Sequence, residues 1–187
     1  MITVSTIDEI VDLYATRGRL HYGEGVTQVE HAVQCAVLAE AGGAARELIV
    51  AALLHDIGHL VVDPDEVVDF RYDDRHEIVG AKALAALFGE AVSRPVALHV
   101  SAKRYLCRSE PGYFAALSPA SQKSLDLQGG AFDRAAADAF ERLPHWREAV
   151  ALRRFDDWGK SDEAARRTFA DFIPEMRALA KSVASAA

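Results

Sequence analysis

The segment AARELIVAALLHDIGHL, residues 44–60, restricts the possible folds of this chain more than any other. The segment is expected to form a helix, and its content of apolar residues is too high for a helix that lies on the protein surface. The segment nevertheless ends in His55, Asp56 and His59, and an unpaired charged group costs several kcal/mol to bury. On one continuous helix His55 and His59 share a face, with Asp56 about 100° from His55 around the axis. We therefore predict a buried helix that contributes ligands to a metal ion.

The remaining sequence predicts an all-α protein, because alternation of apolar and polar residues never persists and alanine is frequent. Ser5 or Thr6 is expected to begin a first helix that ends at Arg17-Gly18. Thr27, with Glu30 three residues later, has the capping-box spacing of a helix start. That second helix should end at Gly42-Gly43. Further helices are expected near 76–87, 92–104, 119–123, 134–143, 145–158 and 161–183.

Length and charge limit the kind of protein. A chain of 187 residues suits a single domain over 1–187, with a metal-binding core at about 27–160 and a C-terminal helix at about 161–183. The net charge is −7 and no basic stretch is longer than a pair, which argues against nucleic acid as a partner. A small anionic substrate is still allowed, because a few cations can dominate one pocket.

The sequence also predicts a cytoplasmic protein with no membrane segment. No apolar run approaches 18 residues, and the N-terminal residues lack the pattern of a signal peptide. Cys35 and Cys107 do not have the spacing of metal ligands, and we expect both to be reduced thiols.

Three further histidines fall on predicted helices, in an order that suggests one site. His31 lies among apolar neighbours, His76 begins a helix, and His99 precedes Lys103 by one helical turn. Each of them alone would more often be a surface or core histidine. Together with His55 and Asp56 they become candidate metal ligands.

An acidic residue is expected to complete this site, and LRRFDDWGK, residues 152–160, offers two. Asp156 shares a helix face with Leu152 and Phe155 and should point toward the core. Asp157 groups with the arginines of this segment, which suggests solvent or an ion pair. We favour Asp156 as the ligand.

These motifs together resemble a known family. The order of His31, His55-Asp56, His76, His99 and Asp156 is similar to the ligand set of a dimetal HD domain, a helical bundle. More closely, the chain resembles the mixed-valent diiron oxygenases of that superfamily, which include myo-inositol oxygenase, and within them the phosphonate-cleaving branch. The matching blocks are GEGVTQVEHAVQCA, LLHDIGH, HVSAKRYLC, LSPASQKSLDLQGG and LRRFDDWGK, which lie between residues 23 and 160.

The resemblance implies two iron ions, Fe(II) and Fe(III), with Asp56 bridging them. His31, His55 and Asp156 would complete one iron site, and His76 and His99 the other. Ligand types alone would also admit manganese or zinc.

The resemblance further implies a phosphonate pocket and residues that approach the reacting centre. The pocket would consist of Lys103, Ser121, Ser124 and Arg153, the groups that a tetrahedral dianion requires. His59 would face the substrate or support a ligand. Tyr22 would cap one iron and Glu24 would lie near it, although this loop is one residue shorter than in some relatives.

The implied reaction is cleavage of a C–P bond by O2. The substrate would be a 1-hydroxy-2-aminoethylphosphonate or its N-trimethylated analogue, and the products phosphate and glycine or glycine betaine. Aromatic residues, Tyr22, Tyr105, Tyr113 and Trp158, could form a cage for a quaternary ammonium. The alternative is an HD phosphohydrolase that uses its metals to activate water on a nucleotide or phosphate monoester.

Overall fold

The computed structural model describes residues 4–21, 25–62, 75–161 and 166–180, and these residues form helices and connecting turns without a strand. The all-α prediction is therefore confirmed. The helices are α1 (Ile7–Arg17), α2 (Gln28–Ala41), α3 (Arg46–Leu54), α4 (Ile57–Val61), α5 (His76–Phe88), α6 (Glu90–Ser109), α7 (Tyr113–Ala116), α8 (Pro119–Leu127), α9 (Arg134–Phe140), α10 (Trp146–Trp158), the 3₁₀ turn η1 (Phe169–Phe172) and α11 (Ile173–Leu179).

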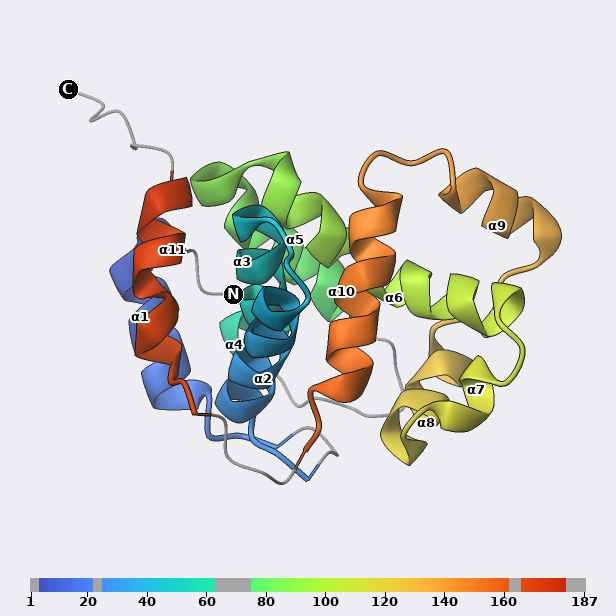
Figure 1. The fold of residues 1–187 in the computed structure, drawn as a ribbon, viewed down its shortest axis with the longest axis horizontal. Coiled ribbons are helices and arrows are strands. Elements are labelled where there is room, and N and C mark those ends of the chain that lie inside the picture. Colours follow the sequence, from blue (N-terminus) through green and yellow to red (C-terminus); the bar gives the residue numbers. More distant parts are fainter. Residues whose placement is uncertain (1–3, 22–24, 63–74, 162–165, 181–187) are drawn as a thin grey trace.

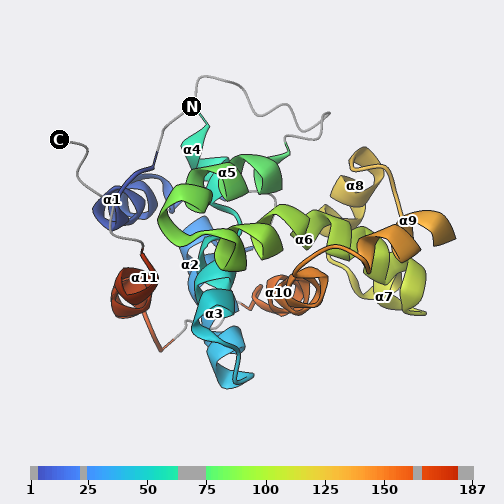
Figure 2. The same ribbon diagram turned by 90° about the horizontal axis from the view of Figure 1, so that it is seen from above.

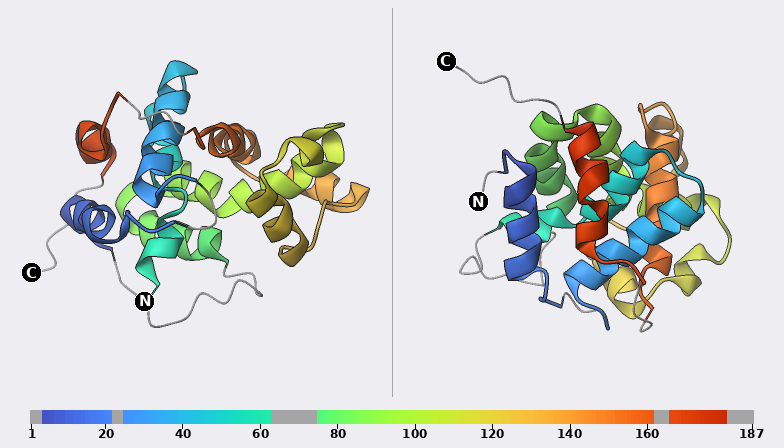
Figure 3. Two further views of the ribbon diagram at one scale, coloured as in Figure 1. Left: turned by 90° about the horizontal axis from the view of Figure 1, so that it is seen from below. Right: turned by 60° about the vertical axis from the view of Figure 1, so that its left-hand side comes forward.

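Helices α2 to α6 and α10 form the centre of the molecule (Figure 1). Helix α6 packs against α5, α10 and α3, while α2 packs against α3 and α10. Helices α1 and α11 lie together at one end, and α7, α8 and α9 extend the other end (Figures 2 and 3). The main apolar core joins α1 to the central helices and to α11, and a smaller cluster lies between α6, α9 and α10. No helix of the described residues is both long and apolar enough to cross a membrane.

Local sequence signals fix several helix starts. Thr6 and Thr27 are the N-caps of α1 and α2. Thr27 forms the predicted capping box with Glu30, and Thr6, one of the two predicted starts, forms another with Glu9. Gly42 ends α2, as expected.

The apolar segment 44–60 differs from the prediction of one continuous helix. Helix α3 ends at Leu54, and α4 begins at Ile57 after a turn through His55 and Asp56. Asp56 has φ −97° and ψ 9°, outside the helical region, so the chain bends at the two polar residues. The bend brings the buried end of α3 and the start of α4 to one point in the core.

The predicted helix over 161–183 is also wrong within the residues described there. Residues 166–168 are not helical, η1 follows, and the α-helix spans only Ile173–Leu179. Thr168 and Asp171 form a capping box that starts a new helical turn. Pro174 in the first turn of α11 prevents a helix from running through this position, because proline has no amide hydrogen.

Candidate active site

The candidate site lies where α2, the α3–α4 turn, α5, α6 and α10 meet. Four histidines from these elements point their Nε2 atoms at one another in two pairs. The Nε2 atoms of His31 and His55 are 3.3 Å apart, and those of His76 and His99 are 3.2 Å apart. The structure thus brings together the four histidines that the sequence singled out as ligands.

Asp56 lies between the two pairs and offers one oxygen to each. Its Oδ2 is 3.5 Å from His55 Nε2 and 3.7 Å from His31 Nε2. Its Oδ1 is 3.5 Å from His76 Nε2 and 3.8 Å from His99 Nε2. The bend after α3 is what turns this carboxylate toward all four rings, an arrangement that suits a bridge between two metal ions.

Asp156 of α10 adds an oxygen to the first pair. Its Oδ1 is 3.3 Å from His31 Nε2 and 3.9 Å from His55 Nε2. Asp157 instead accepts hydrogen bonds from Arg153 and from the hydroxyl of Tyr113. Of the two candidate acids, Asp156 is therefore the one that lies against the histidines.

The hydrogen bonds of the rings show that the cluster is suited to cations. The Nδ1 atoms of His31, His55 and His99 lie 2.7–2.8 Å from the backbone oxygens of Gly159, Ala52 and Val96. A carbonyl oxygen only accepts, so each Nδ1 carries a proton, and in His55 and His99 this leaves the Nε2 lone pair directed into the cluster. Lone pairs and carboxylates that face one another at these distances repel, and metal ions between them would remove the repulsion.

The pKa shifts agree with this reading for most of the groups. Burial disfavours the charge of Asp56, yet His55 and His76 hold its pKa below the usual value. Asp156 is buried too, and Arg153 and Lys160 hold its pKa well below the usual value. Burial and the neighbouring His76 lower the pKa of His99. Both acids are thus anionic and His99 is neutral, which are the forms that bind metals.

His31 differs from His99. Burial opposes its charge, but Cys35 and Asp156 together raise its pKa well above the usual value. A metal ion that binds the ring of His31 would therefore displace a proton. Cys35 is buried, and its Sγ lies 3.7–3.8 Å from the two ring nitrogens of His31, a contact that the sequence analysis missed.

His59 lies beside this cluster rather than inside it. Its ring stacks on that of His76, with the ring centres 4.1 Å apart and the planes 19° from parallel. The predicted loop residues Tyr22 and Glu24 lie outside the described residues.

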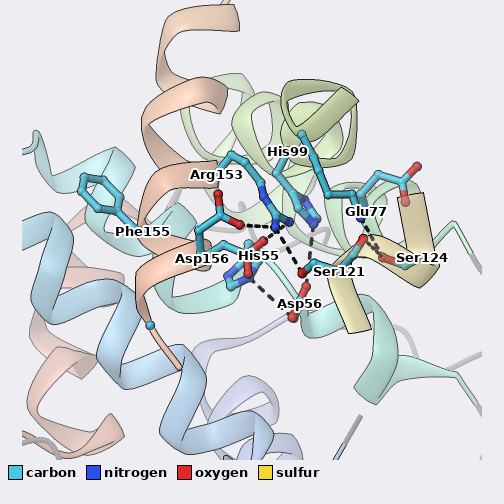
Figure 4. A network of polar contacts seen from close by, with 12 residues as sticks. His55, Asp56, Glu77, His99, Ser121, Ser124, Arg153, Phe155 and Asp156 are labelled. Atoms are coloured by element: carbon cyan, nitrogen blue, oxygen red, sulfur yellow. Dashed lines mark hydrogen bonds and ion pairs between the residues drawn. The ribbon is translucent and has the colours of Figure 1, made fainter. Parts of the chain in front are cut away.

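A second group of residues adjoins the first pair of histidines and contains all four predicted phosphonate ligands. Lys103 of α6 donates to Ser124 Oγ at 2.7 Å, and Arg153 of α10 donates to Ser121 Oγ at 3.4 Å. Figure 4 shows Arg153 between Asp156 and Ser121, next to the histidines and Asp56. Lys160, which the sequence analysis missed, donates to Ser121 Oγ at 3.0 Å and lies 3.8 Å from Asp156 Oδ1.

This basic cluster, made of Lys103, Ser121, Ser124, Arg153 and Lys160, carries three cations in a protein of net negative charge. Lys103 and Arg153 are both buried. Burial first, and then the positive charge of Arg153, lowers the pKa of Lys103 to about 8. Cations that lie close enough to repel one another can bind a multiply charged anion well, because the anion neutralises several of them at once.

The glycines of the block LSPASQKSLDLQGG hold the two serines in place. Gly129 and Gly130 both have positive φ, 91° and 70°, which favours glycine. Their carbonyl oxygens accept hydrogen bonds from Arg104, the neighbour of Lys103 on α6. The end of α8 is thereby fixed against α6, and Ser121 and Ser124 face the cations.

Fold and site together define an HD-domain protein with a dinuclear arrangement of ligands. The HD domain family model matches residues 29–142, and the chain belongs to this family.

Two curated relatives indicate which branch of the HD-domain family this chain belongs to. A hydroxymethylphosphonate dioxygenase of Gimesia maris is 49% identical over 156 residues, which are 82% of this chain and 78% of the relative. The [1-hydroxy-2-(trimethylamino)ethyl]phosphonate dioxygenase (glycine-betaine-forming) of Leisingera caerulea is 39% identical over 178 residues, 92% of this chain and 89% of the relative. The chain is a member of the HD-domain phosphonate oxygenases, as the resemblance in its motifs indicated.

Proposed function

We propose that this protein cleaves the C–P bond of a 1-hydroxyphosphonate with O2. The observation that carries the proposal is the basic cluster placed beside two histidine pairs that share Asp56. The names of both relatives describe a phosphonate with a hydroxyl on the carbon that bears phosphorus. An anion-binding group next to a metal centre suits such a compound, because the phosphonate can be held while its neighbouring carbon reacts.

The metals of the proposal are two iron ions in a mixed-valent Fe(II)/Fe(III) state. One would be held by His31, His55, Asp56 and Asp156, and the other by Asp56, His76 and His99. This donor set of imidazoles and carboxylates fits redox-active iron. Bound iron would supply the activation of O2 and the removal of hydrogen from the carbon that bears phosphorus.

The protein's own groups bind and orient the substrate. Arg153, Lys103 and Lys160 neutralise the phosphonate, and the hydroxyls of Ser121 and Ser124 direct its oxygens. The same cations stabilise the charge of the phosphate as it leaves. Because this cluster is built from three different helices and from Lys160, two residues after the end of α10, it fixes the reacting carbon at a defined distance from the metal centre.

His59 is proposed to support His76 through ring stacking and to face the substrate. Tyr22 and Glu24 are proposed to approach the metal centre from their loop, with Tyr22 restricting O2 activation before substrate binds.

The second substituent on the reacting carbon is proposed to be an aminomethyl or trimethylaminomethyl group. The products would then be phosphate and glycine or glycine betaine, and they contain the two oxygen atoms of O2. Tyr105 is not suited to a cage around the ammonium, because its hydroxyl donates to Glu141 and its ring packs on Phe140 and Trp146, in the cluster between α6, α9 and α10.

Phosphate release under controlled oxygen tests the proposal. The iron-loaded protein is incubated without O2 with hydroxymethylphosphonate, 1-hydroxy-2-aminoethylphosphonate or the trimethylated analogue, and air is then admitted. We expect phosphate only after air enters, and most rapidly with one of the two amine-containing compounds. Phosphate release in the absence of O2, or from phosphate monoesters with zinc or manganese bound, would instead identify a phosphohydrolase.

A further inference from the structure

Arg153 is buried and is held on several edges of its guanidinium group. Its Nε donates to the hydroxyl of Tyr113 at 3.2 Å, and its Nη1 donates to Asp156 Oδ2 at 2.5 Å. Its Nη2 donates to Asp157 Oδ1 and, at the longer distance of 3.4 Å, to Ser121 Oγ. A guanidinium group has five N–H bonds, so these contacts leave one on Nη1 and a weakly held one on Nη2.

Tyr113 and Asp157 form the part of this network that does not face the histidines. The hydroxyl of Tyr113 donates to Asp157 Oδ2, while Asp157 Oδ1 accepts from Arg153. The three side chains therefore close a ring of hydrogen bonds between the start of α7 and the last turns of α10. Tyr113 is only 6% exposed, so the ring is shielded from solvent.

Asp157 also affects which oxygen of Asp156 accepts a hydrogen bond from Arg153. An arginine that faces a single carboxylate tends to pair with both of its oxygens. Here Asp157 takes Nη2 and Asp156 takes Nη1 through Oδ2 alone. Asp156 Oδ1 therefore stays directed at His31 Nε2, 3.3 Å away.

We infer that Tyr113 and Asp157 are positioning residues that hold Arg153 in the orientation needed to bind a phosphonate dianion. The inference rests on the proposed function. Tyr113 and Asp157 hold Nε and one Nη2 hydrogen, while the other contacts of the guanidinium go to Asp156 and Ser121 beside the histidines (Figure 4). A group held in this way loses little conformational freedom when the anion binds.

Binding of methylphosphonate to the iron-loaded protein tests this inference, because the compound has the anionic group but no hydroxyl to react. The variants are Tyr113→Phe and Asp157→Asn, and the matched control is Tyr105→Phe. Tyr105 packs against the same apolar cluster as Tyr113, but its hydroxyl donates to Glu141 and does not contact Arg153. Calorimetry should give a dissociation constant raised about tenfold in each variant, from loss of a hydrogen bond that supports a charged group, and unchanged in the control. The KM of the reacting substrate should rise by the same factor, with kcat changed less than about twofold.

A purely structural role predicts other results. Lower thermal stability with an unchanged dissociation constant, or the same change in the Tyr105→Phe control, would overturn the inference. If Tyr113→Phe does not fold, Asp157→Asn decides alone, because it keeps the size of the side chain and removes its charge.

Failure of the proposed function gives a different pattern. A wild-type protein that binds methylphosphonate but releases no phosphate from hydroxyphosphonates in air contradicts the proposed reaction, while the binding comparison among variants still decides the role of Tyr113 and Asp157. A wild-type protein that does not bind methylphosphonate overturns the inference itself.

Discussion

At the scale of single residues, the site depends on two side chains that each serve two neighbours. Asp56 directs one oxygen to each histidine pair, and Arg153 lies between Asp156 of the metal centre and Ser121 of the basic cluster. The metal centre and the anion-binding group are therefore linked through Asp156 and Arg153. A substitution at either Asp56 or Arg153 should affect more than one part of the site.

Lys103 gives the basic cluster a predicted dependence on pH. Burial, together with Arg153, lowers the pKa of its ammonium group to about 8. Lys103 is charged below that pH and neutral above it, so attraction for a dianion is present below pH 8 and lost as the pH rises. We expect kcat/KM for the phosphonate to fall above this pH, by up to about tenfold per pH unit.

A pH profile of kcat/KM checks this prediction. In Lys103→Arg the decrease should disappear, because a guanidinium group stays charged throughout. The matched control is Lys123→Arg, at an exposed position on α8, which should keep the wild-type profile. A decrease that persists in Lys103→Arg would assign the titration to another group.

At the scale of elements, the close approach of α4 and α5 places His76. A Cβ atom added to Gly58 would lie 2.0 Å from the backbone oxygen of His76 and 2.9 Å from its Cα, far closer than non-bonded atoms can approach. Gly80 is also packed against this contact, but a Cβ there would meet Gly58 N at 3.1 Å. The absence of a side chain at residue 58 thus allows the His76 ring to reach Asp56.

We predict that Gly58→Ala destabilises the protein and loosens the second histidine pair. The added methyl group must push α5 away, at a cost of about 1–3 kcal/mol. Thermal denaturation should show a clear decrease in Tm, and metal analysis should show reduced iron content after purification. Gly80→Ala should have a smaller effect on both. If Gly58→Ala keeps the wild-type Tm and iron content, the approach of α4 to α5 does not determine where His76 lies.

The elements also show which features the sequence can predict. The capping box at Thr27 follows from a spacing of three residues and is confirmed. The inward face of Asp156 follows from spacings of three and four residues, and the structure places this carboxylate against His31. The bend at His55-Asp56 is not visible in a local pattern, because it is determined by the contacts that Asp56 makes with distant helices. Lys160 follows the end of α10 and meets Ser121 only in the folded protein, so periodicity alone did not single it out.

At the scale of the whole molecule, the metal centre joins helices that are distant in sequence. His31 lies on α2, His55 and Asp56 on the turn after α3, His76 on α5, His99 on α6 and Asp156 on α10. These polar groups, four of them buried and Asp56 and His76 half-buried, face one another in the middle of the central helices. Metal binding should therefore contribute to the stability of the fold as well as to the reaction.

We predict that removal of iron by a chelator lowers the Tm of the wild-type protein by about 10 °C. Saturating metal stabilises the folded state by about 3–4 kcal/mol, and each kcal/mol shifts the Tm of a domain of this size by about 2–4 °C. Differential scanning calorimetry before and after chelation measures the shift, and adding Fe(II) back should restore it. Asp56→Asn should bind little iron, because both histidine pairs lose a charged oxygen, and chelation should barely change its Tm. An exposed carboxylate on α9, Asp138, provides the matched control, and Asp138→Asn should respond to chelation as the wild type does. A wild-type Tm that is insensitive to chelation would mean that direct packing of the central helices, rather than the metal centre, determines their stability.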